Sequence, residues 1–422
     1  MRRLLATFVG AIALLGVASD ALAAKPHGLD LKALRRALNS DLSSIGGADG
    51  AYVVDLTTGR ALFYFSARTE RIPASLQKLY TTTTALLRLG PAAVLKTSVL
   101  GTGAPNRAGT WKGTIYLRGG GDPSFGSARF DEAAYGTGAT IQALARAVRG
   151  TGIRRIVGRI VGDESRFDAR RGTPATDYKR SYYLEGQLSA LAYDRGFANA
   201  AWTRFQTHPA LFAARHFAAA LRAVGIAVPS SVRISTGVTP ADASPIASVN
   251  SPPVAKLIEL TNTPSDNFFA EMLLKNLGAD FGGKGSTAAG VKVVRGELAR
   301  RFGLHPRFDD GSGLSRYDAT SPMQVVRLLR RMAGDPYFTH SLAIAGETGT
   351  LIDEMRDTRA QGRCLGKTGT LYDVASLAGY CTARDGHTLT FAFMLNQIAN
   401  PDTGHAVEAN MAVALANFDG KL

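Results

Sequence analysis

The stretch of sequence that decides the fold spans residues 73–80 and reads Pro73-Ala74-Ser75-Leu76-Gln77-Lys78-Leu79-Tyr80. The proline and the apolar pattern that continues from position 79 to position 89 predict a helix that begins near Ser75. On such a helix Ser75 and Lys78 lie on one face, about one turn apart, which is the spacing of a nucleophile and its base. Alone this signal is weak, because Ser-x-x-Lys occurs by chance in most proteins of this size.

Two further short motifs follow along the chain. Ser265-Asp266-Asn267 comes directly after a predicted helix break, and Lys367-Thr368-Gly369 lies within an extended run. Taken one at a time, each motif has a plain structural explanation, because Ser, Asp and Asn often cap helices and Lys is often a surface charge. The three motifs in this order are far more specific than any one of them.

The ordered set resembles the motifs of the penicillin-recognising serine enzymes, which are the penicillin-binding proteins and the serine β-lactamases. Two other stretches narrow the resemblance, Gly119-Gly120-Gly121-Asp122-Pro123 and Asp310-Gly311-Ser312-Gly313-Leu314-Ser315-Arg316. Together they resemble the D-alanyl-D-alanine carboxypeptidase/endopeptidase family of class C low-molecular-mass penicillin-binding proteins, peptidase family S13. The resemblance covers essentially the whole mature chain.

The resemblance implies that Ser75 attacks the carbonyl group between two D-alanines, that Lys78 takes its proton, and that Ser265 relays the proton to the leaving D-alanine. A free lysine titrates near pH 10.4, so the pKa of Lys78 must be lowered before it can act as a base at pH 7. We expect Lys367 to contribute, because two like charges about 4 Å apart cost roughly 4 kcal/mol at an effective dielectric of 20. The helix N-terminus lowers the pKa as well.

The resemblance also implies which residues bind the substrate. Asn267 holds the amide of the donor peptide, and Lys367 and Thr368 bind the terminal carboxylate. Gly369 lacks a side chain, which leaves room for a peptide alongside the strand. The backbone N–H groups of Thr370 and of the nucleophile form the oxyanion hole, where the loss of one donor typically costs on the order of 3 kcal/mol.

Residues 1–23 are predicted to be a secretory signal peptide, because a charged start, an apolar run and the small residues Ala21-Leu22-Ala23 follow one another. No later stretch is apolar enough to span a bilayer, so we expect a soluble mature protein. Export behind this signal peptide places it in the periplasm as an expectation. The formal charge of +15 favours binding to an anionic cell-wall polymer, although it can also serve solubility alone. Dispersed Lys and Arg residues in an exported chain argue against nucleic acid. The seven His residues form no ligand spacing, so neither a metal nor a cofactor is expected.

The expected fold class is α+β, with a domain like that of penicillin-binding proteins and serine β-lactamases, in which an antiparallel sheet carries helices on both sides. An N-terminal hairpin at residues 51–65 and three extended runs after residue 361 predict this sheet. We assign residues 24–95 and 245–422 to this D,D-peptidase domain. Residues 96–244, whose short β-like runs are broken by Gly, Pro and Asn, are assigned to an inserted β-rich domain.

The chain contains two cysteines, Cys364 and Cys381. An exported chain meets an oxidising compartment, so we expect these cysteines to form a disulfide. They flank two β-like runs separated by a turn, an arrangement that places them opposite each other across an antiparallel hairpin.

Two stretches depart from the family pattern. The segment between Ser75 and Ser265 is long enough for an inserted domain, but it is short for the two nested modules that the family often carries. Residues 172–183 lack the tryptophans often found there, and Asp177 is the candidate for a pocket that takes the side chain of the peptide's diamino acid.

The leading hypothesis is a serine D-Ala-D-Ala carboxypeptidase/endopeptidase that cleaves peptidoglycan stem peptides through a Ser75 acyl-enzyme and is acylated by β-lactam antibiotics. A β-lactamase or esterase with the same residues is an alternative, although no Glu-based deacylation motif is clear. A wall-binding or penicillin-sensing protein without turnover is a third hypothesis. The sequence does not separate carboxypeptidase from endopeptidase activity, because both pass through the same acyl-enzyme.

Overall fold

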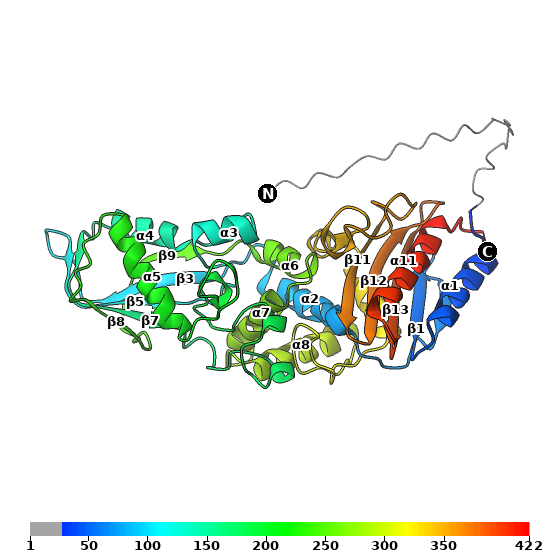
Figure 1. The fold of residues 1–422 in the computed structure, drawn as a ribbon, viewed down its shortest axis with the longest axis horizontal. Coiled ribbons are helices and arrows are strands. Elements are labelled where there is room, and N and C mark those ends of the chain that lie inside the picture. The colour runs from blue at the N-terminus through cyan, green and yellow to red at the C-terminus, as the bar shows by residue number, and fades with distance from the viewer. Residues whose placement is uncertain (1–27, 422) are drawn as a thin grey trace, which may run out of the picture.

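A computed structural model describes residues 28–421, and the predicted signal peptide at residues 1–23 lies outside this range. The chain forms an elongated molecule with one β-sheet toward each end and a group of helices between the sheets (Figure 1). The mixture of helices with a fully antiparallel sheet confirms the predicted α+β class.

The first sheet has six strands in the order β10-β11-β12-β13-β1-β2, and every neighbouring pair is antiparallel. The strands span Gly50–Asp55 (β1), Ala61–Phe65 (β2), Ala343–Ile344 (β10), Cys364–Leu371 (β11), Val374–Thr382 (β12) and Thr388–Asn396 (β13). The central strands β12 and β13 are buried along nearly their whole length, so they are apolar throughout rather than alternating. Of the described strands, only β10 pairs with the outer side of β11, and that pairing ends at Gly366.

Helices cover both faces of this sheet, as predicted. The helices outside the insert are α1 (Leu31–Ile45), α2 (Gln77–Leu89), α6 (Val254–Asn262), α7 (Asn267–Phe281), α8 (Thr287–Phe302), α9 (Pro322–Met332), α10 (Pro336–His340) and α11 (Pro401–Asn417). On one face, α1 and α11 join Phe391 and Phe393 of β13 in a core cluster. On the other, α2, α7 and α9 join Ala392 and Met394. Because successive side chains of β13 point to opposite faces of the sheet, the core is divided into two layers, one on each face.

The second sheet has five strands in the order β8-β7-β5-β3-β9. They span Lys96–Thr102 (β3), Thr114–Arg118 (β5), Arg159–Asp163 (β7), Arg233–Thr236 (β8) and Ser244–Asn250 (β9). Strands β5, β7 and β8 run parallel, which requires crossover connections, and α4 (Ile141–Gly150) and α5 (Pro209–Ala223) lie in these connections.

The remaining elements are short. They are β4 (Thr110–Trp111), β6 (Arg155–Ile156), α3 (Ala128–Ala134), and the 3-10 helices η1 (Ala74–Leu76), η2 (Pro174–Thr176), η3 (Tyr182–Leu184), η4 (Asp194–Gly196) and η5 (Gly349–Leu351). The predicted entry into the insert at residue 96 coincides with the first residue of β3. The predicted return at residue 245 does not fit, because β9 begins at Ser244 and pairs with β3. The chain leaves the second sheet only after Asn250.

Part of the insert packs into the core of the peptidase domain. Phe167, Leu184 and Leu188 come from the insert, yet they belong to the same core cluster as Phe268 and Met272 of α7. The sequence predicted a separate module at residues 96–244. The shared core shows that the insert and the helices beside Ser75 support each other.

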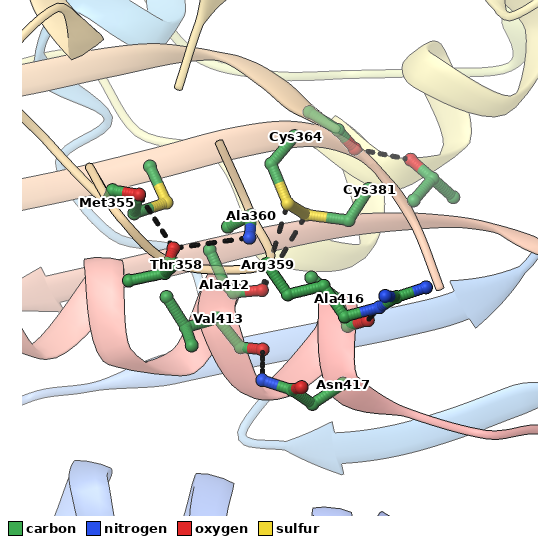
Figure 2. The surroundings of a disulfide bond; sticks show 12 residues. Met355, Thr358, Arg359, Ala360, Cys364, Cys381, Ala412, Val413, Ala416 and Asn417 are labelled. Atoms are coloured by element: carbon green, nitrogen blue, oxygen red, sulfur yellow. Dashed lines mark hydrogen bonds between the residues drawn. A yellow bond between two sulfur atoms is a disulfide. The ribbon is translucent and has the colours of Figure 1, made fainter. Parts of the chain in front are cut away.

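The predicted disulfide joins Cys364 and Cys381. The two residues are direct partners in the antiparallel register of β11 and β12, as expected from the hairpin. Figure 2 shows the bridge beside α11, where both sulfur atoms lie 3.8 Å from the carbonyl oxygen of Ala412. The bridge therefore secures the register of the strand that carries Lys367-Thr368-Gly369.

Candidate active site

Ser75 lies in η1, which leads directly into α2, so the predicted helix begins where expected. The preceding residue, Ala74, has φ = 48°, in the left-handed region that residues with a side chain seldom adopt. A side chain at position 313 would collide with the carbonyl oxygen of Ala74, so Gly313 allows its loop to pack closely against this turn. Strained backbone of this kind gathers at functional sites.

Lys78 connects the first two motifs. Its Nζ atom lies 2.7 Å from Ser75 Oγ, 2.6 Å from Asn267 Oδ1 and 2.8 Å from the carbonyl oxygen of Ser312. The amide and carbonyl oxygens can only accept hydrogen bonds, whereas the Ser75 hydroxyl also has a proton to donate. A neutral amine, with two N–H groups and one lone pair, satisfies all three contacts if Ser75 donates to it. The geometry is that of a nucleophile and its base.

Burial lowers the pKa of Lys78 from 10.5 to about 8. Nearby carboxylates act in the opposite direction, and Glu185 and Asp310 are the strongest of them. For Lys367, burial and then the charge of Lys78 lower the pKa well below 10.5. The prediction that Lys367 depresses the pKa of Lys78 is therefore corrected. Desolvation produces the shift at Lys78, and the repulsion between the two lysines acts on Lys367.

Two buried carboxyl groups hold the loop that carries the Ser312 carbonyl group. Glu271 Oε1 accepts hydrogen bonds from the backbone N–H groups of Gly311 and Ser312, both at 2.8 Å. Asp310 accepts from two further N–H groups of the same loop at 2.7 and 2.8 Å. The sequence marked residues 310–316 only as a family resemblance. The structure gives them a physical role, which is to position an acceptor for Lys78.

The second motif lies at the start of α7. Asp266 caps the first turn of this helix and forms a two-pronged ion pair with Arg195, with N–O distances of 2.5 and 2.9 Å. Asn267 contacts Lys78 through Oδ1, and its Nδ2 atom donates to the carbonyl oxygen of Tyr183 at 2.7 Å. The orientation of the Asn267 amide is thus fixed from both sides.

Ser265 occupies the turn between α6 and α7 and has φ = 66°, which is again in the left-handed region. It is half-buried, and no hydrogen bond from its hydroxyl group is seen within residues 28–421. The three partners of Lys78 do not include Ser265. Its predicted part in proton relay therefore stays a prediction.

The insert contributes two charged residues that the sequence analysis missed. Arg195 is only 4% exposed, and besides its ion pair with Asp266 it donates to the carbonyl oxygen of Glu185 at 2.6 Å. The Glu185 carboxylate accepts from the backbone N–H of Asn267 at 3.2 Å. Arg195 lies in the short 3-10 helix η4 and Glu185 directly follows η3. Neither residue belongs to a recognisable motif, so only their contacts in space reveal them. Asp177, the predicted pocket residue, is exposed, and none of the described hydrogen bonds or ion pairs joins its side chain to the three motifs.

The third motif lies on β11, at the unpaired side of the strand. Lys367 is fully buried, and its Nζ atom donates to the carbonyl oxygen of Thr368 at 2.8 Å. A Cβ atom at Gly369 would lie 2.8 Å from the carbonyl oxygen of Pro73 and 2.9 Å from the backbone nitrogen of Ser75. Gly369 thus lets the strand approach the nucleophile. The predicted room for a peptide alongside the strand stays a prediction.

Thr368 and Thr370 lie on the opposite face of β11 from Lys367 and Gly369, because successive residues of a strand face opposite sides. The Thr368 hydroxyl donates to Thr350 Oγ1 at 2.8 Å, and Thr370 Oγ1 lies 2.7 Å from His405 Nε2. Within residues 28–421, no group of three or more His, Cys, Asp or Glu side chains is arranged to hold a metal ion. No helix in the same range is long and apolar enough to cross a membrane.

Comparison with known proteins places this arrangement in a family. The family model of D-Ala-D-Ala carboxypeptidase 3 (S13) matches residues 32–207 and 179–418. The chain belongs to this family. A D-alanyl-D-alanine carboxypeptidase of Actinomadura sp. is 29% identical to the S13 chain described here, over 96% of this chain and 88% of its own length. The carboxypeptidase DacB of Mycolicibacterium smegmatis is 31% identical, over 89% of this chain and 81% of its own length.

Solved structures agree on the fold. Penicillin binding protein 4 of Haemophilus influenzae has a TM-score of 0.75 to this S13 peptidase at 20% sequence identity, and the match covers 90% of this chain and 98% of that one. The family and the fold class predicted from the three motifs are therefore confirmed.

Proposed function

We propose that the protein is a serine D-Ala-D-Ala carboxypeptidase that acts on peptidoglycan stem peptides through a Ser75 acyl-enzyme. The observation that carries this proposal is the contact of the buried Lys78 amine with Ser75 Oγ at 2.7 Å, while two pure acceptors occupy its remaining positions. Membership of the S13 family supports the choice of substrate.

The reaction begins when neutral Lys78 takes the proton of Ser75 and Oγ attacks the carbonyl carbon between the two D-alanines. The backbone N–H groups of Ser75 and Thr370 stabilise the oxyanion. The carbon–nitrogen bond then breaks, and Ser265 passes the proton to the departing amine. Water hydrolyses the ester that remains, which releases the shortened peptide and restores the Ser75 hydroxyl.

Substrate binding is assigned to the open side of β11 and to the start of α7. Asn267 holds the donor peptide, while Lys367 and Thr368 bind the terminal carboxylate of the leaving residue. Gly369 keeps the strand close to Ser75, which brings the carboxylate site next to the nucleophile. A β-lactam offers a strained amide in the same place, so it acylates Ser75 and blocks the site. We place the protein in the periplasm, where these peptides are found.

The test is release of D-alanine from diacetyl-L-Lys-D-Ala-D-Ala. The wild-type protein is expected to release D-alanine, and Ser75→Ala is expected to release none, because the nucleophile is gone. Absence of D-alanine release by the wild type, together with rapid hydrolysis of penicillin, would favour the β-lactamase alternative. Absence of both activities would favour the wall-binding alternative.

A further inference from the structure

A cavity of about 300 Å³ lies beside β11, the strand that carries Lys367-Thr368-Gly369. Its walls come from the loop around η5, from β11 and from α11. Thr368 and Thr370 of β11 line it, so the cavity begins where the proposed carboxylate site ends.

One wall of this cavity holds a buried carboxyl group with an unused acceptor. Glu408 is 1% exposed, and its Oε2 atom lies 3.1 Å from Nδ1 of His405. Its other oxygen, Oε1, has no hydrogen-bond partner among the described residues. A buried acceptor without a partner is unfavourable, and a ligand with an N–H donor would remove that penalty. His405 also contacts Thr370, so the carboxyl group is connected to the proposed substrate site.

The charges around the cavity favour the same kind of ligand. Glu354, from the loop after η5, is a second acidic residue on its wall. Among the lining residues the one basic side chain is that of His405, which contacts Glu408, and none is Lys or Arg. This acidic cavity stands out in a chain with a formal charge of +15. Leucine, methionine and alanine side chains fill the remaining wall, which suits a chain of methylene groups.

We propose that this cavity is a subsite for the leaving residue, and that it takes a side chain of several methylene groups ending in an N–H donor. The inference rests on the proposed function, because Thr368, which is assigned to the carboxylate of the leaving residue, also lines the cavity. The donor is either an ammonium group, which can donate to both the free oxygen of Glu408 and the carboxylate of Glu354, or an amide, whose single N–H can donate to one of them.

Four peptides of the form diacetyl-L-Lys-D-Ala-X test this subsite, where X is D-alanine, D-norleucine, D-lysine or Nε-acetyl-D-lysine. D-Norleucine has the methylene chain without the donor. We expect kcat/KM for release of D-lysine or of its acetylated form to exceed that of D-norleucine about tenfold, the size of one charge-assisted hydrogen bond. A preference for D-lysine would identify the ammonium, a preference for Nε-acetyl-D-lysine would identify the amide, and equal rates would show that the subsite accepts either donor. Rates no higher than that of D-norleucine would overturn the inference.

Variants locate the effect within the cavity. Glu354→Gln and Glu408→Gln are each expected to lower the ratio of the D-lysine rate to the D-norleucine rate, and Glu354→Gln decides the matter if Glu408→Gln does not fold. Asp353→Asn is the matched control, because Asp353 is an exposed neighbour that pairs with Arg356 and does not line the cavity. A ratio that both glutamine variants leave unchanged would overturn the inference. Release of D-alanine without any preference would overturn the subsite alone, whereas release of no residue would overturn the proposed function with it.

Discussion

Among the single residues, the protonation of Lys78 controls the proposed chemistry. The amine must be neutral to accept the Ser75 proton, and burial lowers its pKa to about 8. The amine is therefore protonated at lower pH and becomes a base as the pH rises through 8. Nearby carboxylates favour the protonated form, so the pKa of Lys78 reflects a balance between burial, which lowers it, and these negative charges, which raise it.

This balance predicts a shift in the pH profile of Glu185→Gln. The Glu185 carboxylate raises the pKa of Lys78, so removing its charge is expected to lower that pKa further. The midpoint of the rate of acylation by a fluorescent penicillin should move from about 8 in the wild type to a lower pH. Glu132→Gln, which changes an exposed acid on α3, should leave the midpoint in place. A midpoint that rises in Glu185→Gln would contradict this electrostatic account.

The residues of the three motifs could be found from the sequence because their order is specific, but their neighbours could not. Glu185 and Arg195 are single charged residues at or beside short 3-10 helices, and Glu271 lies inside an apolar helix. Each acts through backbone groups or side chains that are distant in sequence. The pKa argument failed for the same reason, since the degree to which Lys78 is buried depends on packing that no local pattern shows.

At the level of elements, the hairpin of β11 and β12 carries the third motif and is fastened at its far end by the disulfide. Cys364 and Cys381 are direct partners in its register, and the bridge lies against α11 (Figure 2). The hairpin was predictable, because two extended runs and a short turn separate the cysteines. The open side of β11 was not, because the sequence gives no sign of where the pairing with β10 ends.

Loss of this disulfide is expected to lower the free energy of unfolding by about 3 kcal/mol in the chain-entropy model, because the bridge closes a short loop in the unfolded chain. Urea unfolding of the wild type and of the Cys364→Ser/Cys381→Ser double variant measures the difference. A reducing agent should shift the wild-type midpoint and leave that of the double variant unchanged. Equal midpoints for the two oxidised proteins would show that the bridge contributes no stability.

At the level of the whole molecule, the insert belongs to the active site as well as to its own sheet. Leu184 lies in the core beside α7, and the residues on either side of it reach Asn267: the carbonyl group of Tyr183 accepts from its amide, and the Glu185 carboxylate accepts from its backbone. Composition indicated the insert but not this contact, because short β-like runs suggest an independent module. The return boundary of the insert was misplaced at residue 245, because the Ser244-Pro245 pair is typical of a linker, whereas in the structure it begins β9.

Substitution of two buried leucines separates the contribution of the insert to the active site from its contribution to stability. Leu184→Ala and Leu144→Ala should each lower the free energy of unfolding by roughly 2–5 kcal/mol, because both side chains are fully buried. Only Leu184→Ala should also slow acylation, since Leu144 lies in the separate core of the second sheet. Rates are compared on folded protein at low temperature. An equal loss of acylation rate in both variants would mean that the insert affects the site only through overall stability.

The central claim is that Ser75 is the nucleophile, and mass spectrometry of the protein after incubation with benzylpenicillin tests it most directly. Intact mass followed by peptide mapping should show one adduct, on the peptide that contains Ser75, and Ser75→Ala should show none. An absence of adduct on the wild type, or an adduct that persists in Ser75→Ala, would contradict the account.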